Sequence, residues 1–321
     1  MPRAARLDVP GLLQHVIVRG IERRDIFLDD EDRHFFVQRL SELLVKTSTD
    51  CFAWALMSNH FHLLVRPCYG KLAVFMRRLL TGYAVTFNLR HSRSGHLFQN
   101  RYKSIVCDHD EYMLELVRYI HLNPVRAGVV TDVCCLERYP WCGHSVVVGN
   151  GQLQGQDVGS VLGCFGRKIG DARRRYRLFV EDGVAHGRRD DLVGRKSFGL
   201  SASPAGVFDA RILGDSDFIE RLRLEEPLRG RIEVKAPFQE IVEKSAKQFG
   251  IPDRALSSAS RAPVVVKARA IACHSALSAG YSAAEAGRYL RMSRFGVSAA
   301  AIRGKAMVDA GEYIDNIAGS K

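Results

Sequence analysis

The chain has 321 residues, and 46% of them are hydrophobic, which is enough apolar material for two domains or for one domain with a large appendage. No run of about 18 apolar residues and no secretion-type apolar segment is present, so we expect a cytoplasmic protein with no membrane span. The net charge of +12 favours a polyanionic partner, above all nucleic acid, and predicts association with the nucleoid.

Residues 1–145 alternate between the periodicities of strands and of helices. In chain order we predict a strand over 12–20, a helix over 31–47, strands over 51–57 and 60–67, a helix over 71–91, a strand or strand pair over 95–108, and a helix over 110–124. This order is typical of an α+β fold, a ferredoxin-like antiparallel sheet with helices on one face.

The rest of the chain divides into two further regions. Residues 146–230 are rich in Gly and Arg and are interpreted as a basic connecting region with short helices. Residues 231–321 are Ala-rich and predict a helical domain. The eight cysteines form no C-x-x-C pair, so we expect free thiols rather than a disulfide framework or a zinc knuckle.

Within the third region, residues 264–305 have the pattern of three short helices. Ser282 and Glu285 form a capping box, residues 291–293 form a tight turn, and Ser293 caps the next helix. The expected core positions are Ala286, Leu290, Val297 and Ile302. The pattern resembles a helix-turn-helix of the replication-initiator or Trp-repressor kind, and this resemblance implies major-groove contacts from Arg294, Ser298, Arg303 and Lys305. A generic helical or dimerisation unit is the alternative.

The stretch "MSNHFHLLV" (57–65) contains two histidines one residue apart. Residues two apart on a strand point to the same side, so His60 and His62 project together and Phe61 projects to the other side. Two neutral imidazoles side by side can bind one divalent metal. The alternative is a pair of packed strand histidines, and His15 in the first strand is open to the same two interpretations.

The helix predicted over 110–124 has two faces. Its apolar stripe comprises Met113, Leu116, Val117 and Ile120. An adjacent stripe comprises Tyr112, Glu115, Tyr119 and Asn123, and His121 lies off this stripe. A carboxamide oxygen is an acceptable third ligand for a hard metal such as Mg²⁺ or Mn²⁺, so this face can complete a metal site with a hydroxyl nearby.

Four segments together carry a resemblance to a known family. "HVIVRG" (15–20), "MSNHFHLLVRP" (57–67), "GHLFQNRYKS" (95–104) and "YIHLNPVRAGVV" (119–130) occur in this order. They resemble the HUH single-tyrosine transposases of bacterial insertion sequences, most closely the branch associated with repetitive extragenic palindromes. The resemblance covers roughly residues 10 to 145.

The resemblance implies a metal-dependent reaction on single-stranded DNA flanking hairpins. By position it implies that Tyr119 is the nucleophile that forms a 5′-phosphotyrosine link, and that His60 and His62 bind Mg²⁺ or Mn²⁺. It implies Asn123 as the third ligand, with Glu115 as the rival ligand and Tyr112 as the alternative nucleophile. Candidate contacts to the DNA strand are Arg19, Arg101, Tyr102 and Arg126.

Three other functions remain open at this point. A DNA-binding regulator with an inactive transposase domain would keep the fold without cutting. A replication or conjugation initiator would share the chemistry, but those enzymes usually place the tyrosine before the histidines or carry paired tyrosines. An RNA-binding protein on a ferredoxin-like sheet would bind without metal. The oligomeric state is equally open, and both a monomer and a homodimer are compatible with the sequence.

Overall fold

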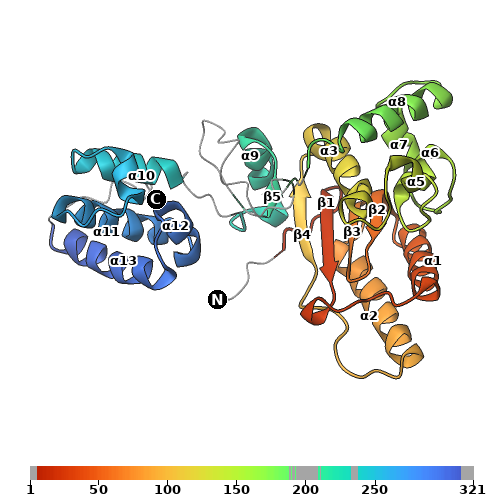
Figure 1. Cartoon of the computed structure of the whole chain (residues 1–321), viewed down its shortest axis with the longest axis horizontal. Helices are drawn as coiled ribbons and strands as arrows, with labels where there is room; N and C mark the ends of the chain where they lie inside the picture. Colours follow the sequence, from red (N-terminus) through yellow and green to blue (C-terminus); the bar gives the residue numbers. More distant parts are fainter. Residues whose placement is uncertain are drawn as a thin grey trace. The chain divides into compact units, whose positions relative to one another are not determined.

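The structure is a computed structural model, and it describes residues 6–187, 189, 192, 209, 211–232 and 238–311. The chain forms two compact units, which divide after Arg231. Figure 1 shows the elements of both units. Within the described residues, no helix is both long enough and apolar enough to cross a membrane.

The first unit contains all five strands and most of the helices. Its elements are β1 (Leu13–Arg19), η1 (Ile21–Arg23), α1 (Asp30–Lys46), β2 (Thr49–Leu56), β3 (His60–Pro67), α2 (Leu72–Arg90), β4 (Lys103–Cys107), α3 (His109–His121), α4 (Asn123–Arg126), α5 (Val133–Leu136), α6 (Gly143–Val148), α7 (Val158–Gly163), α8 (Ile169–Asp182), β5 (Ile212–Leu213), α9 (Ser216–Leu224) and η3 (Glu226–Leu228).

The strands form one sheet in the order β2-β3-β1-β4-β5. The pairs β2–β3, β1–β3 and β1–β4 are antiparallel, whereas β5 pairs with β4 in parallel. The sheet is therefore mixed at one edge rather than wholly antiparallel as predicted. The two residues of β5 carry no strand signal of their own, because their pairing depends on a chain segment that returns from about 100 positions away.

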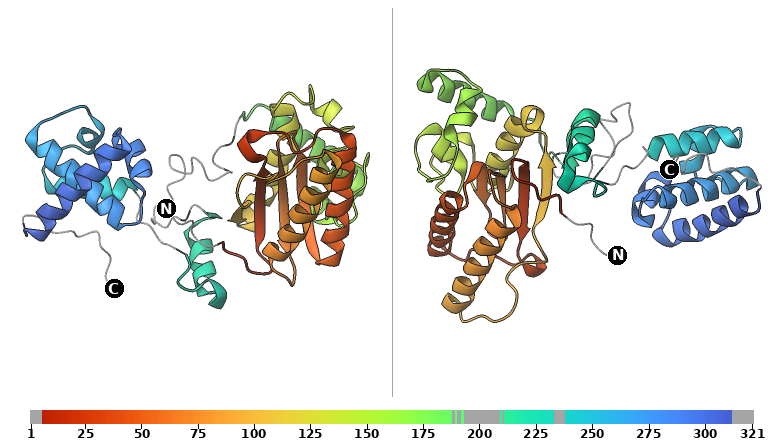
Figure 2. Two further views of the ribbon diagram at one scale, coloured as in Figure 1. Left: turned by 90° about the horizontal axis from the view of Figure 1, so that it is seen from below. Right: turned by 180° about the vertical axis from the view of Figure 1, so that it is seen from behind.

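The helices cover both faces of the sheet, so the prediction of helices on one face was wrong. One core contains Val16, Phe61, Leu63 and the apolar sides of α1 and α2. The second core contains Leu13, Leu64 and the stripe of α3. Figure 2 shows α1 and α2 on one side of the strands. Both faces of β1 and β3 are buried, and this burial requires a helical layer on each face. The α+β class itself is confirmed.

The helices after α4 extend the second core. Val161 of α7 and Tyr176 of α8 are buried in it together with Leu116 of α3. The 14-residue helix α8 is longer than the short helices predicted for residues 146–230. Part of the segment interpreted as a connection thus folds together with the sheet, and it packs beside the helix that carries Tyr119.

The second unit is helical in its described residues. It comprises α10 (Phe238–Gln248), η4 (Asp253–Ser257), α11 (Pro263–Ser278), α12 (Ala283–Leu290) and α13 (Arg294–Asp309). At Gly304 the helix α13 approaches α11 so closely that an added Cβ would lie 2.1 Å from the carbonyl oxygen of Ala270. A side chain at this position would therefore force the two helices apart.

The helix caps predicted for the second unit are present. The capping box of Ser282 and Glu285 is formed, and the Ser293 hydroxyl accepts a hydrogen bond from the Gly296 amide at the start of α13. Ala286, Leu290 and Val297 are buried as expected, but Ile302 is 72% exposed. The prediction for Ile302 was wrong because Ala300, Ala301 and Gly304 form the packed face of α13 and turn Ile302 to the solvent.

Candidate active site

The strands β1 and β3 bring three histidines to the face of the sheet that α3 covers. His60 pairs with Arg19 and His62 pairs with Ile17 in the register of the two strands, while His15 lies two residues before Ile17. His15 and His62 are buried, and His60 is half-buried. The prediction that His60 and His62 project to the same side is confirmed, with ring centroids 5.3 Å apart.

Each of the two paired histidines has a polar partner at its Nδ1 atom. The Nδ1 atom of His62 lies 2.9 Å from Nε2 of His15. The Nδ1 atom of His60 lies 2.6 Å from the side-chain oxygen of Asn59. Asn59 in turn donates from Nδ2 to the backbone oxygen of Arg23 at 3.1 Å. These contacts leave Nε2 of His60 and of His62 as the nitrogens that could bind a metal.

Burial keeps all three imidazoles neutral near pH 7. It lowers the pKa of His15 to about 3, and the nearby charge of Lys103 acts in the same direction. It lowers the pKa of His60 to about 4, with a smaller contribution from Arg19. Burial also brings the pKa of His62 well below its ordinary value. A neutral imidazole has a free lone pair, which is the form that binds a metal.

Helix α3 places Tyr119 against these histidines. Asp108 caps the helix by accepting a hydrogen bond from the Asp110 amide, and the predicted apolar stripe of α3 is buried. The ring of Tyr119 lies edge-on to the rings of His15 and His62, with centroids 6.0 Å away in both cases. Tyr119 is half-buried, so its ring is held in place while part of the residue faces solvent.

The two candidates for a third ligand differ in their surroundings. The carboxylate of Glu115 accepts hydrogen bonds from Arg118 at 2.6 and 2.8 Å, and from Arg189 at 3.3 Å. Asn123 begins α4, where Pro124 fits the first turn without losing a hydrogen bond. The amide nitrogen of Asn123 is buried and has no hydrogen-bond partner within the described part of the chain. The nitrogen position of this carboxamide is therefore one where an oxygen could be placed by a rotation of the group without loss of a hydrogen bond from the nitrogen.

The residues of this unit that were predicted to contact the DNA strand do not form one group. Arg126 lies over the ring of Tyr119, with 5.5 Å between the guanidinium carbon and the ring centroid, and it donates to the backbone oxygens of Tyr119 and Gly183. Arg19 lies beside His60, and Arg101 is exposed. Tyr102 is buried, and Arg6 covers its ring at 3.7 Å, so this ring is not free to stack on a base.

The predicted contacts in the second unit are exposed residues of α13: Arg294 and Ser298 lie one turn apart, and Arg303 lies more than two turns after Arg294 on another side of the helix. The hydroxyl of Ser298 donates to the backbone oxygen of Arg294, and the guanidinium of Arg294 lies 5.2 Å from the ring of Phe295. Phe295 is itself 76% exposed, so this surface combines positive charge with apolar side chains.

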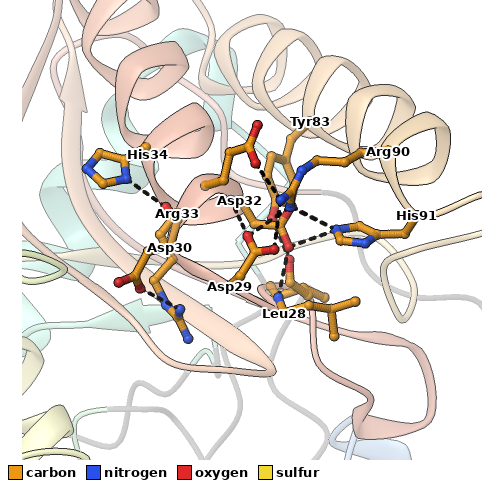
Figure 3. A network of polar contacts seen from close by, with 11 residues as sticks. Leu28, Asp29, Asp30, Asp32, Arg33, His34, Tyr83, Arg90 and His91 are labelled. Carbon is orange, nitrogen blue, oxygen red and sulfur yellow. Dashed lines mark hydrogen bonds and ion pairs between the residues drawn. The ribbon is translucent and has the colours of Figure 1, made fainter.

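One other group of possible metal ligands exists in the described residues, namely Asp29, Asp32 and His91. Figure 3 shows that the guanidinium of Arg90 lies among these carboxylates. Arg90 donates to both oxygens of Asp29 at 2.8 and 2.7 Å and to Asp32 at 2.6 Å. These bonds lower the pKa of Asp29 to about 2. The cluster already contains its cation, and it ties the start of α1 to the end of α2.

A buried polar cluster beside α3 was not predicted from the sequence. The hydroxyl of Tyr176 lies 2.6 Å from Nδ1 of His121 and 3.2 Å from Nδ1 of His144. The three side chains come from α3, α6 and α8, and all are fully buried. No sequence signal joins them, because His121 and Tyr176 are 55 residues apart and their helices have separate apolar patterns.

Comparison with known proteins finds a family that resembles part of the first unit. The family model described as transposase, IS200-like, matches residues 8–123, which run from before β1 to the first residue of α4. Residues 8–123 are thus similar to the IS200-like transposase family, and this match supports a function of the transposase type. The matched stretch contains His15, His60, His62 and Tyr119 and ends at Asn123.

One similar solved structure is a tyrosine transposase associated with REP sequences, bound to a REP hairpin. It is 17% identical, and the match covers 46% of this chain and 86% of the other, with a TM-score of 0.39. A likeness this weak carries no argument about function. Among curated proteins, no similar sequence was found.

Proposed function

We propose that the first unit is a metal-dependent endonuclease and strand transferase for single-stranded DNA, with Tyr119 as its nucleophile. The observation that carries the proposal is the contact between the rings of Tyr119 and His62 on one face of the sheet. A tyrosine packed against the histidines of this face fits a role as nucleophile toward a phosphate that a metal would polarise. The family assignment of residues 8–123 supports the same chemistry.

In the proposed site, His60 and His62 bind Mg²⁺ or Mn²⁺ through Nε2, and Asn123 supplies the third protein ligand. Glu115 is the weaker candidate, because Arg118 and Arg189 already neutralise its carboxylate. The bound ion would polarise the scissile phosphate and offset its charge. Arg126 and Arg19 lie on the same side and would hold the phosphate backbone of the strand.

The proposed reaction keeps the energy of the cleaved bond. The Tyr119 oxygen attacks phosphorus, the bond from phosphorus to the 3′ oxygen breaks, and this oxygen leaves as a 3′-OH after taking a proton. The 5′ phosphate remains on Tyr119. Attack by the 3′-OH of another strand end forms the new phosphodiester and returns the proton to Tyr119, so no nucleotide cofactor is needed. Hairpin-flanking DNA is the proposed substrate.

Covalent capture tests this proposal. Labelled single-stranded hairpin oligonucleotides from the flanks of the coding sequence are incubated with the protein and Mg²⁺ or Mn²⁺, and the products are run on denaturing gels. We expect a labelled protein band that disappears in Tyr119→Phe and in His60→Ala and persists in Tyr112→Phe. Tyr112 is the matched control, because it lies on the same helix seven residues earlier.

Other outcomes would select a rival function. An adduct that survives Tyr119→Phe but is lost in Tyr112→Phe would move the nucleophile to Tyr112. Tight binding without an adduct, equally strong with and without metal, would favour a regulator with an inactive transposase domain. Cleavage confined to a replication or transfer origin would favour an initiator.

We further propose that α12 and α13 form a helix-turn-helix that binds duplex DNA through Arg294, Ser298 and Arg303. One observation favours this function over a generic helical unit. Between residues 261 and 305 the chain carries eight basic side chains and a single acidic one, Glu285. Four of the basic residues lie on α13 or in the turn before it, namely Arg291, Arg294, Arg303 and Lys305. A surface of this charge suits a phosphate backbone.

The salt dependence of duplex binding tests the second proposal. The full chain is titrated with a fluorescent random-sequence duplex at several salt concentrations. Arg294→Ala is expected to reduce the slope of log K against log salt by about 1, as the loss of one phosphate contact does. Arg254→Ala, on η4 of the same unit, is the control. An equal slope for Arg294→Ala and the wild-type protein would favour a dimerisation unit, and the molecular mass in solution would then decide between monomer and homodimer.

A further inference from the structure

The two proposed ligand histidines share a feature that their metal-binding role alone does not require. Each has its Nδ1 atom within hydrogen-bond distance of a different side chain, Asn59 for His60 and His15 for His62. A neutral imidazole has one N–H and one lone pair. If Nε2 is to bind a metal, the proton must be on Nδ1, and the partner of Nδ1 must accept it.

Asn59 is oriented to accept. Its amide nitrogen donates to the backbone oxygen of Arg23, and a carbonyl oxygen can only accept, so the side-chain oxygen must be the atom that faces His60. The turn that carries Asn59 is itself fixed, because the Gly20 amide donates to the backbone oxygen of Asn59 at 2.8 Å. The carboxamide is thus held as an acceptor before any metal arrives.

His15 is fixed by its position in the sheet. It lies in the central strand β1, opposite Leu64 of β3 and Ile105 of β4, and it is completely buried. Its Nε2 can accept the proton of His62 only if His15 carries its own proton on Nδ1. In that tautomer His62 would donate to His15, and the lone pair of His62 at Nε2 would be left for the metal.

We propose that Asn59 and His15 are positioning residues that fix His60 and His62 in the tautomer that binds metal through Nε2. The inference rests on the proposed metal site. The partner behind a ligand histidine fixes the orientation and the tautomer of the ring, and removing it typically weakens metal binding about 10- to 100-fold. Neither positioning residue would touch the metal or the DNA.

Mn²⁺ binding to the metal-free protein, measured by the electron paramagnetic resonance of free Mn²⁺, tests the inference without DNA or activity. We expect Asn59→Leu and His15→Leu to weaken binding about 10- to 100-fold. Asn59→Asp and His15→Gln keep an acceptor and are expected to recover most of the loss. Gln14→Leu is the matched control, because Gln14 precedes His15 on β1, is equally buried and faces the opposite side of the sheet.

Nitrogen NMR of the imidazoles gives a second readout that a purely structural role would not move. In the wild-type protein we expect His60 and His62 to be protonated at Nδ1 and not at Nε2. The leucine variants are expected to show a mixture of tautomers while the fluorescence of Trp54 and Trp141 stays native. If His15→Leu fails to fold, the half-buried Asn59 still allows the test, since it lies just before β3 and outside the strands.

The outcomes separate the inference from the metal site on which it rests. If His60→Ala and His62→Ala lose Mn²⁺ binding but the leucine variants bind like the wild-type protein, the metal site stands and the positioning role is overturned. If His60→Ala and His62→Ala both bind Mn²⁺ like the wild-type protein, the metal site itself is wrong and the inference fails with it.

Discussion

The first unit contains two groups of buried histidines, and they differ in what their nitrogens meet. In the group of His15, His60 and His62, Nδ1 of His60 and of His62 each has a partner, and the rings of His15 and His62 adjoin the half-buried Tyr119. In the group of His121 and His144, both Nδ1 atoms meet the hydroxyl of Tyr176, and both Nε2 atoms are buried without a hydrogen-bond partner in the described residues.

Burial lowers the pKa of the histidines in both groups. A shifted pKa therefore does not identify the active site of this protein, because the interior of the helical layer produces the same shift as the site beside Tyr119. The distinguishing feature is access. His60 and Tyr119 of the first group are themselves half-buried, whereas His121, His144 and Tyr176 are all fully buried, so the first group is the more accessible to a metal and a DNA strand.

The largest expected effect is a difference in the rate of adduct formation between variants of the two histidine groups. His62→Ala should reduce the rate of adduct formation by about 10³-fold or more, because a lost metal ligand removes several kcal/mol of stabilisation from the transition state. His144→Ala should leave the rate per folded molecule within about threefold of the wild-type rate, since His144 is fully buried beside Tyr176 and His121. Single-turnover cleavage measures both, and equal losses in the two variants would contradict the distinction.

The second expected effect concerns stability and pH. The pKa of His144 is about 3 in the folded chain, whereas an unfolded histidine titrates near 6.5. Between pH 3 and pH 6.5 the imidazole of His144 is protonated in the unfolded chain but not in the folded chain. The free energy of unfolding therefore has its full value above about pH 6.5 with respect to this group, and it falls as the pH is lowered toward 3. From pH 7 to pH 5 the loss amounts to about 2 kcal/mol for this one group.

Urea unfolding at pH 7 and pH 5 measures this loss. The two tryptophans of the chain, Trp54 and Trp141, both lie in the first unit, so their fluorescence reports on that unit alone. His144→Gln should unfold with a smaller difference between the two pH values than the wild-type protein does. The neighbouring Arg177 and His121 remain in this variant, so the change is specific to His144. An unchanged difference would mean that His144 does not titrate on unfolding.

The sequence predicted the proposed site to the extent that local spacing defines it. The period of two placed His60 and His62 on one side of a strand, and the helical spacing separated the buried stripe of α3 from Tyr119. Each pattern involves residues of one strand or one helix only, and the contacts with other elements did not change the direction of these side chains. The capping signals at Ser282 and Ser293 succeeded for the same reason.

What the sequence did not reveal depends on pairing between distant segments. The contact of His15 with His62 depends on the register of β1 and β3, which joins residues 47 positions apart. Arg6 covers Tyr102 from across 96 positions, and Ile302 faces solvent because Gly304 decides which side of α13 packs on α11. Periodicity gives the direction of a side chain within its own element, but it does not give the partner on the next element.

The smallest expected effect concerns the hydroxyl at the centre of the second group. Tyr176→Phe removes the one group that both His121 and His144 contact, so two further buried nitrogens lose their hydrogen-bond partner. We expect the unfolding free energy of the first unit to fall by about 1 kcal/mol, with the rate of adduct formation nearly unchanged. Tyr112→Phe, which changes a half-buried tyrosine of α3, should cost less than about 0.5 kcal/mol. A large loss of activity in Tyr176→Phe at native stability would instead mean that this cluster influences Tyr119, which lies two residues before His121 on α3. The two histidine groups would then not differ in their effect on activity.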